Sequence, residues 1–214
     1  MTSDRAFEQI RSALTGRSPR PVDDLDFPRA AVLIPVLVRP DGPAILFTER
    51  THTVHDHKGQ ISFPGGRAEA GEDAKATALR ESFEEVGLAP ESVEIAGTLD
   101  DQLAVSRYIV TPMVGIVRNP PAVWTPQASE VAVPFEVPLT RLLDPAHLRR
   151  ELWDASMMPP GAPVKEILES RVTLEEVDPV TGQYAVYFFD GGNGRVIWGL
   201  TARILKQLLD VAFR

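Results

Sequence analysis

The chain of 214 residues contains no cysteine, which excludes disulfide bonds, thiolate zinc sites and cysteine nucleophiles. It has no apolar run near the roughly 18 residues that a membrane-spanning helix requires. Residues 1–5 lack the apolar stretch of a secretory signal peptide. These absences predict a cytoplasmic protein that does not associate with a membrane.

A positive surface is also lacking, because 30 acidic residues outnumber 22 basic ones and the formal net charge is −8. Nucleic-acid binding depends on clustered positive charge, so we expect no nucleic-acid partner. An anionic small molecule would need local neutralisation, which a bound divalent cation supplies. The apolar fraction of 43% and the charged fraction of 24% are typical of a soluble globular protein.

Residues 1–214 show no break in composition, and we expect a single domain with an N-terminal helix and lead-in (1–29) and a core (30–214). Apolar spacing predicts helices over residues 4–16, 73–86 and 200–213. Strands are expected at 30–38, 44–48, 93–98, 108–117, 131–137 and 184–189. This mixture predicts an α+β fold in which helices cover both faces of a sheet.

The helix at 73–86 carries the most informative pattern. At about 100° per residue, it is predicted to turn one apolar face to the sheet, made of Ala76, Leu79, Phe83 and Val86. The opposite side gathers three glutamates, Glu81, Glu84 and Glu85, whose spacing makes them neighbours. Three carboxylates this close repel one another, so they need either open solvent or a cation.

Carboxylate oxygens are the ligands that Mg²⁺ and Mn²⁺ prefer. Arg80 is expected to pair with Glu72 at the start of the helix, and the Gly65–Gly66 pair lets backbone carbonyls approach a metal or a phosphate. The alternative is a solvated helix face with ordinary ion pairs, such as Arg80 with Glu84. The fixed offsets of the glycines and of the paired charges favour the metal site.

These residues resemble the Nudix box, G-x5-E-x7-R-E-U-x-E-E-x-G-U, in which U is a bulky apolar residue. The matching positions are Gly66, Glu72, Arg80, Glu81, Glu84, Glu85, Gly87 and Leu88. Ser82 departs from the first apolar position, and the helical wheel places it beside the core face. The resemblance implies an α/β/α sandwich fold with a mixed sheet. It also implies an enzyme that hydrolyses nucleoside diphosphates linked to another group.

The sequence before the box is similar to the coenzyme A pyrophosphatase branch, L-L/F-T-x-R-S/A-x3-R-x3-G-x3-F-P-G-G. It reads LFTER at 46–50 and GQISFPGG at 59–66. Thr51 replaces the usual Ser or Ala, and His55 replaces an Arg, which weakens a fixed positive charge. The similarity continues from Ala30 through most of the chain and implies cleavage of coenzyme A, or its acyl or oxidised forms, to 3′,5′-ADP and 4′-phosphopantetheine.

The resemblance also implies roles for individual residues. Expected metal ligands are Glu81, Glu85, Glu84 and the Gly66 carbonyl, and the general base is either Glu84 or Glu130. The expected substrate contacts are Arg50, His55, Lys58, Phe63 and Arg67, with Glu72 and Arg80 orienting the cluster. A zinc site at His52, His55 and His57 is an alternative, which the absence of cysteine and of a helical histidine pair disfavours.

Other functions remain open at this stage. A Nudix enzyme could act instead on ADP-ribose, NADH or a dinucleoside polyphosphate, although residues 91–111 lack the proline of the ADP-ribose branch and the chain lacks the cysteines of the NADH branch. A non-catalytic nucleotide sensor is a second alternative, but all the box carboxylates are present. Trp198 and Phe189 are expected in the core rather than stacked on adenine. A homodimer is usual among relatives.

Overall fold

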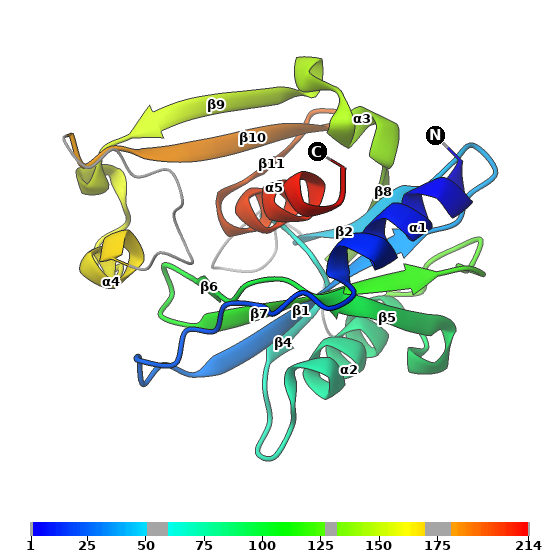
Figure 1. Cartoon of the computed structure of the whole chain (residues 1–214), viewed down its shortest axis with the longest axis horizontal. Helices are drawn as coiled ribbons and strands as arrows, with labels where there is room; N and C mark the ends of the chain where they lie inside the picture. The colour runs from blue at the N-terminus through cyan, green and yellow to red at the C-terminus, as the bar shows by residue number, and fades with distance from the viewer. Residues whose placement is uncertain (1, 51–59, 127–131, 170–180, 214) are drawn as a thin grey trace.

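The computed structural model describes residues 2–50, 60–126, 132–169 and 181–213. Figure 1 shows an eight-stranded mixed sheet with α2 (Ala74–Val86) on one face. The helices α1 (Ser3–Leu14) and α5 (Gly199–Phe213) cover the other face. The predicted α+β sandwich with a mixed sheet is confirmed. Within these ranges, no helix has the length and apolar character needed to cross a membrane.

The strands β1 (Arg29–Leu37) and β7 (Ile109–Val117) run parallel at the centre of the sheet. Both are largely buried because helices cover them on two sides, which explains their nearly continuous apolar sequence. On the far side of β7 lie β5 (Val93–Thr98) and β6 (Gln102–Leu103), both antiparallel to it. On the other side, β2 (Ala44–Arg50) pairs with β8 (Ala132–Pro138) along its whole length.

The sheet splits between β1 and β2. These strands pair only where Val36 and Leu37 face Ile45 and Ala44. Beyond that point β3 (Ile61–Ser62) pairs with β2, and β4 (Gly65–Arg67) pairs with β1. Residues 61–67 therefore cross the split from one half of the sheet to the other, and the Leu33 N–H donates to the Pro64 carbonyl at the crossing (2.9 Å).

A second sheet of three antiparallel strands packs beside α5. It consists of β9 (Leu148–Trp153), β10 (Tyr184–Gly192) and β11 (Arg195–Trp198). The short helices are α3 (Leu139–Leu143), α4 (Val164–Glu169) and the 3-10 turns Pro90–Ser92, Pro145–His147 and Ala155–Met157. Since α5 lies between the two sheets, its buried residues extend beyond the single predicted stripe: Thr201, Ala202, Ile204, Leu205, Leu208, Leu209 and Ala212.

The predicted core face of α2 is confirmed at Val86, which is fully buried, but it was wrong for Ala76 and Phe83, which are exposed. Phe83 is 48% exposed, whereas Ala78, Ser82 and Val86 are fully buried against the sheet. Ser82 therefore lies at the centre of the packed face, where its hydroxyl donates to the Ala78 carbonyl (2.6 Å) and satisfies its hydrogen-bonding capacity. This orientation of α2 places the neighbouring Glu81 against Gly66 of β4. A helical wheel that counts only apolar residues cannot predict a packing contact made by a glutamate.

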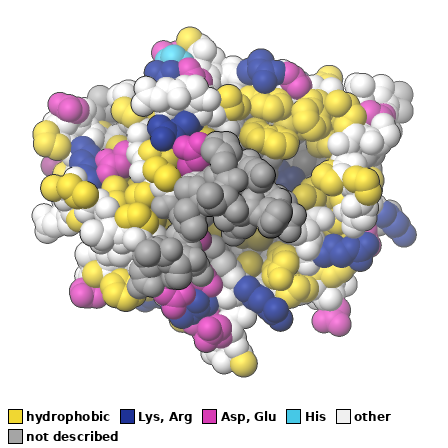
Figure 2. All heavy atoms as spheres, turned by 180° about the vertical axis from the view of Figure 1, so that it is seen from behind, with side chains coloured by type: hydrophobic (Ala, Val, Ile, Leu, Met, Phe, Trp, Pro, Cys, Tyr) yellow, Lys and Arg dark blue, Asp and Glu magenta, His cyan; other side chains and the backbone are white. Residues whose placement is uncertain are grey.

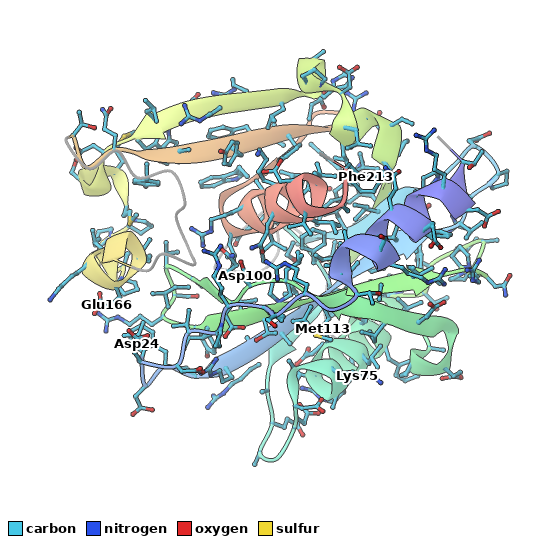
Figure 3. The ribbon with its side chains drawn as sticks, viewed as in Figure 1. Asp24, Lys75, Asp100, Met113, Glu166 and Phe213 are labelled. Carbon is cyan, nitrogen blue, oxygen red and sulfur yellow. The ribbon has the colours of Figure 1, made fainter. Side chains whose placement is uncertain are left out.

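Asp100 ties the N-terminal lead-in to the sheet and to α5 (Figure 3). Its side chain is fully buried and accepts hydrogen bonds from Arg17 (2.6 Å), from the Arg20 backbone and side chain, and from Gln207 (2.7 Å). Burial alone would raise the pKa of Asp100, but the bonds from Arg20 and Arg17 outweigh it and hold the pKa below its usual value. The carboxylate is therefore ionised and paired.

Replacing Asp100 by asparagine removes the charge and leaves two arginines without their partner. We expect the D100N variant to lose about 3 kcal/mol of unfolding free energy at neutral pH, measured by urea denaturation. Since the folded-state pKa is lowered, the contribution of Asp100 is present above its unfolded pKa and disappears as pH falls through the lowered value. The deficit of D100N should therefore shrink in acid.

The matched control is Asp24→Asn, because Asp24 is exposed and points away from the core (Figure 3). Its stability should stay within about 0.5 kcal/mol of the parent. Equal losses in the two variants would contradict a specific role for the Asp100 network.

Candidate functional site

The helix α2 is fixed at both ends by its own sequence. At its start, the Asp73 carboxylate accepts a hydrogen bond from the Ala76 N–H (2.7 Å), as an N-cap does. At its end, Gly87 adopts a left-handed conformation (φ 72°) and its N–H bonds to the Phe83 carbonyl, while Leu88 bonds to Ser82. These caps set which residues of α2 face the sheet.

Arg80 lies at the centre of a carboxylate cluster on α2. As the sequence predicted, it pairs with Glu72, through Nε at 2.8 Å and Nη2 at 3.0 Å. Its Nη1 donates to Glu81 (2.9 Å) and to Glu84 (3.1 Å), and Nη2 also donates to the Arg67 carbonyl (3.0 Å). The pairing of Arg80 with Glu84, which the sequence allowed as an alternative, thus coexists with the pairing to Glu72.

The pKa of the Glu72 carboxyl group is strongly lowered. Hydrogen bonds from Arg80, then from the Glu69 N–H and the Thr77 hydroxyl, lower the pKa of Glu72 to about 2. The Arg80 pKa is raised in turn, mainly by its bond to Glu72. Glu72 therefore stays ionised under all ordinary conditions and serves to orient Arg80.

Two glycines allow the carboxylates to approach the main chain. A Cβ at Gly66 would lie 2.5 and 2.6 Å from the two oxygens of Glu81, so the carboxylate of Glu81 lies directly against the Gly66 backbone. The Gly65 N–H donates to Glu85 (3.3 Å), and a Cβ at Gly65 would lie 2.6 Å from the Cα of Val32. Only glycine fits at either position without displacing a neighbour.

The donor set has the chemistry that a divalent cation requires. Three carboxylates, those of Glu72, Glu81 and Glu84, bind the guanidinium of Arg80. The Glu85 carboxylate accepts from the Gly65 N–H beside them. Negative charge is therefore in excess, and the oxygens are hard ligands. In the described part of the chain, no three acidic or histidine side chains already stand in a metal-binding arrangement. Instead, the Nη1 of Arg80 donates to both Glu81 and Glu84.

The other predicted site residues fall into three groups. His55, Lys58 and Glu130 lie outside the described residues, as does the side chain of Arg50. Phe63 is 2% exposed and stacks on Phe47 at 4.9 Å, so its ring is a core residue and is not available to a substrate in this structure. The side chain of Arg67 is exposed at the end of β4, beside the cluster that its carbonyl joins.

Sequence reasoning missed four supporting residues. Asp73 and Thr77 could have been found, because an aspartate before a predicted helix is an N-cap signal and Thr77 lies one turn from it. The pair formed by Glu49 and Arg195 joins β2 to β11 across 146 positions (2.8 Å), and no local pattern announces it.

The NUDIX domain family matches residues 27–159, which include the whole cluster. The chain belongs to the Nudix family. An uncharacterized Nudix hydrolase NudL from Salmonella dublin is 33% identical over 203 residues, covering 94% of this chain and 88% of that protein. The NudL of Salmonella paratyphi B is 35% identical over the same lengths. The protein is therefore a Nudix hydrolase, which acts on pyrophosphate-containing substrates.

Solved structures resemble part of this chain at low sequence identity. The Ap4A hydrolase of C. elegans, in a binary complex, is 20% identical over 53% of this chain and 81% of its own, with a TM-score of 0.44. The NUDIX domain of Shewanella oneidensis NrtR, complexed with ADP ribose, is 16% identical over 60% of this chain and 79% of its own, with a TM-score of 0.42.

The Arg80 network predicts a measurable shift in Glu72. In the metal-free protein, the R80Q variant should raise the pKa of Glu72 from about 2 toward its ordinary value of 4.5, because the main cause of the lowering is removed. A ¹³C NMR titration of the glutamate carboxyl groups would measure both values. R80K, which keeps the charge, should give an intermediate pKa, and an unchanged pKa in R80Q would contradict the assignment.

Proposed function

We propose that this Nudix hydrolase cleaves the pyrophosphate bond of coenzyme A, including its acyl or oxidised forms, and releases 3′,5′-ADP and 4′-phosphopantetheine. One observation carries the proposal: the segment with the coenzyme A branch pattern, ending in Phe63-Pro64-Gly65-Gly66, supplies the main chain against which Glu81 and Glu85 lie. The segment that we propose selects the substrate therefore also contacts the carboxylate cluster.

Mg²⁺ or Mn²⁺ would be held by Glu81 and Glu85, with Glu84 and the Gly66 carbonyl completing the set. When bound, such an ion offsets phosphate charge and lowers the pKa of a coordinated water. Arg80 orients Glu81 and Glu84 through its Nη1. The side chain of Glu84 is 43% exposed, against 14% for Glu81, which suits Glu84 to accept a proton from an attacking water. Glu130 is the alternative base.

Two considerations bear on the rival substrates. The NrtR domain was solved with ADP ribose, and the C. elegans enzyme is an Ap4A hydrolase, so Nudix proteins accept several nucleotides. His55, where the coenzyme A branch has arginine, is the departure that bears most on the choice. ADP-ribose, NADH and dinucleoside polyphosphates are therefore the substrates to compare, and a cytoplasmic homodimer remains the expected working form.

A direct assay compares coenzyme A, ADP-ribose, NADH and a diadenosine polyphosphate, each with Mg²⁺ or Mn²⁺, by chromatography and mass spectrometry. We expect coenzyme A to give the highest kcat/KM, with 3′,5′-ADP as a product. Glu85→Gln should lower kcat/KM by at least about 100-fold, since even groups that only support a metal ligand are worth 10- to 100-fold.

Lys75→Gln is the matched control, because Lys75 lies on the exposed side of the same helix (Figure 3). It should keep full activity. Turnover of another nucleotide with coenzyme A left intact would overturn the substrate assignment. An active Glu85→Gln enzyme would instead overturn the assignment of the metal ligands.

A further inference from the structure

A cavity of about 380 Å³ opens where the two sheets meet, outside the carboxylate cluster. Glu49 and Ile61 of β2 and β3 form one wall, and Arg195, Val196 and Trp198 of β11 form the other. Its volume falls within the range of small-molecule sites, which is about 300–1,000 Å³. Glu49 and Ile61 belong to the segment before the Nudix box, but neither residue was among the predicted site residues.

Trp198 supplies an aromatic surface to this cavity. The sequence placed Trp198 and Phe189 in the core. Phe189 is indeed 1% exposed, but Trp198 is 46% exposed and the prediction for it was wrong. Its ring stacks on Phe188 with an interplanar angle of 9° and a centroid distance of 6.3 Å. Phe188 thus supports one side of the indole, and the exposed remainder can receive a planar ligand.

Exposed apolar side chains gather on this side of the molecule. Figure 2, which views the face behind that of Figure 1, shows hydrophobic side chains grouped at the top, over the three-stranded sheet. In β11, Val196 and Trp198 are each close to half exposed, and both line the cavity. Apolar surface of this kind on a soluble protein is often a binding surface.

The ion pair of Glu49 and Arg195 lines the same cavity and forms what we call its polar edge. Arg195 Nε donates to Glu49 (2.8 Å), and the guanidinium lies 4.4 Å from the centroid of the Phe135 ring. About three-quarters of both charged side chains is buried. The guanidinium has further N–H donors and the carboxylate has further acceptor sites, so the pair can bind a ligand that offers both an acceptor and a donor.

The cavity lies close to the carboxylate cluster along the chain. Ile61 lines the cavity and Gly66 contacts Glu81, and five residues of extended chain span at most about 17 Å. Ile61 and Gly66 belong to the segment that crosses the split in the sheet. A nucleotide with its pyrophosphate at the cluster can therefore direct its other end toward the cavity.

We propose that this cavity binds the nucleobase of the substrate, an inference that rests on the proposed function. The base stacks on Trp198, an exocyclic amine donates to Glu49, and Arg195 donates to a ring nitrogen. The carboxylate of Glu49 disfavours a phosphate in the same space, which assigns the cavity to the base rather than to a phosphate group. An adenine offers the amine and the ring nitrogen that this edge requires.

The test measures binding without turnover. In the Glu85→Gln background, calorimetry would give the affinities for 3′,5′-ADP and, separately, for 4′-phosphopantetheine. Trp198→Leu should lower the affinity for 3′,5′-ADP by about 10-fold or more, as expected when a base loses its aromatic stacking partner. The affinity for 4′-phosphopantetheine should be unchanged. Trp153→Phe is the control, because Trp153 belongs to the same aromatic group but does not line the cavity. Thermal melts would verify that each variant folds.

A second variant tests the polar edge with little change in shape. Glu49→Gln should weaken 3′,5′-ADP more than the corresponding guanine nucleotide, because guanine presents a carbonyl where adenine presents an amine. Unchanged binding of 3′,5′-ADP in both Trp198→Leu and Glu49→Gln would overturn the proposal. Loss of phosphopantetheine binding instead would overturn it too, by assigning the cavity to the other end of the substrate.

These outcomes are separable from those of the proposed function. Should coenzyme A be left intact while Trp198→Leu still weakens 3′,5′-ADP, the base site stands and the substrate assignment fails. Should coenzyme A be cleaved with the same KM by the wild type and by Trp198→Leu, the substrate assignment stands and the base site fails.

Discussion

The close approach of two glycines to two carboxylates is the constraint on which the rest of the site depends. Residues 61–67 must cross from β2 to β1 where the sheet splits, and they must do so with Glu81 and Glu85 directly beside them. A side chain at Gly66 would occupy the space of the Glu81 carboxylate. The missing side chains thus allow backbone and carboxylate oxygens to converge at the place where we propose that the metal ion binds.

Arg80 offsets the repulsion between the carboxylates that converge here. It binds Glu72, Glu81 and Glu84 together, and Glu72 remains ionised because its pKa is lowered to about 2. One guanidinium bound to three carboxylates still leaves negative charge in excess. The arrangement therefore holds the carboxylates in place without neutralising them, which leaves them able to bind a divalent ion.

Much of this could be predicted from the sequence, because the information is local. Fixed offsets predicted the pairing of Arg80 with Glu72, and apolar runs predicted the long strands and α1, α2 and α5. The strand β9 was missed because Arg149, Arg150 and Glu151 interrupt any alternation, and β3, β4 and β6 are too short to show a period. The buried face of α2 was misjudged because apolar periodicity does not register the packing of Glu81 against β4. The Glu49–Arg195 pair depends on tertiary structure alone.

The central claim is that the absence of a side chain at Gly66 lets the Glu81 carboxylate bind a metal ion. It is tested most directly by measuring Mn²⁺ binding to the Gly66→Ala variant through the relaxation rate of water protons. The three atoms nearest to the added methyl group all belong to the Glu81 carboxyl group, which can turn away. The variant should therefore fold with a melting temperature close to that of the parent. Because the Glu81 carboxylate is displaced, the affinity for Mn²⁺ should fall by about 10-fold or more. A folded variant that binds Mn²⁺ as tightly as the wild type would contradict the account.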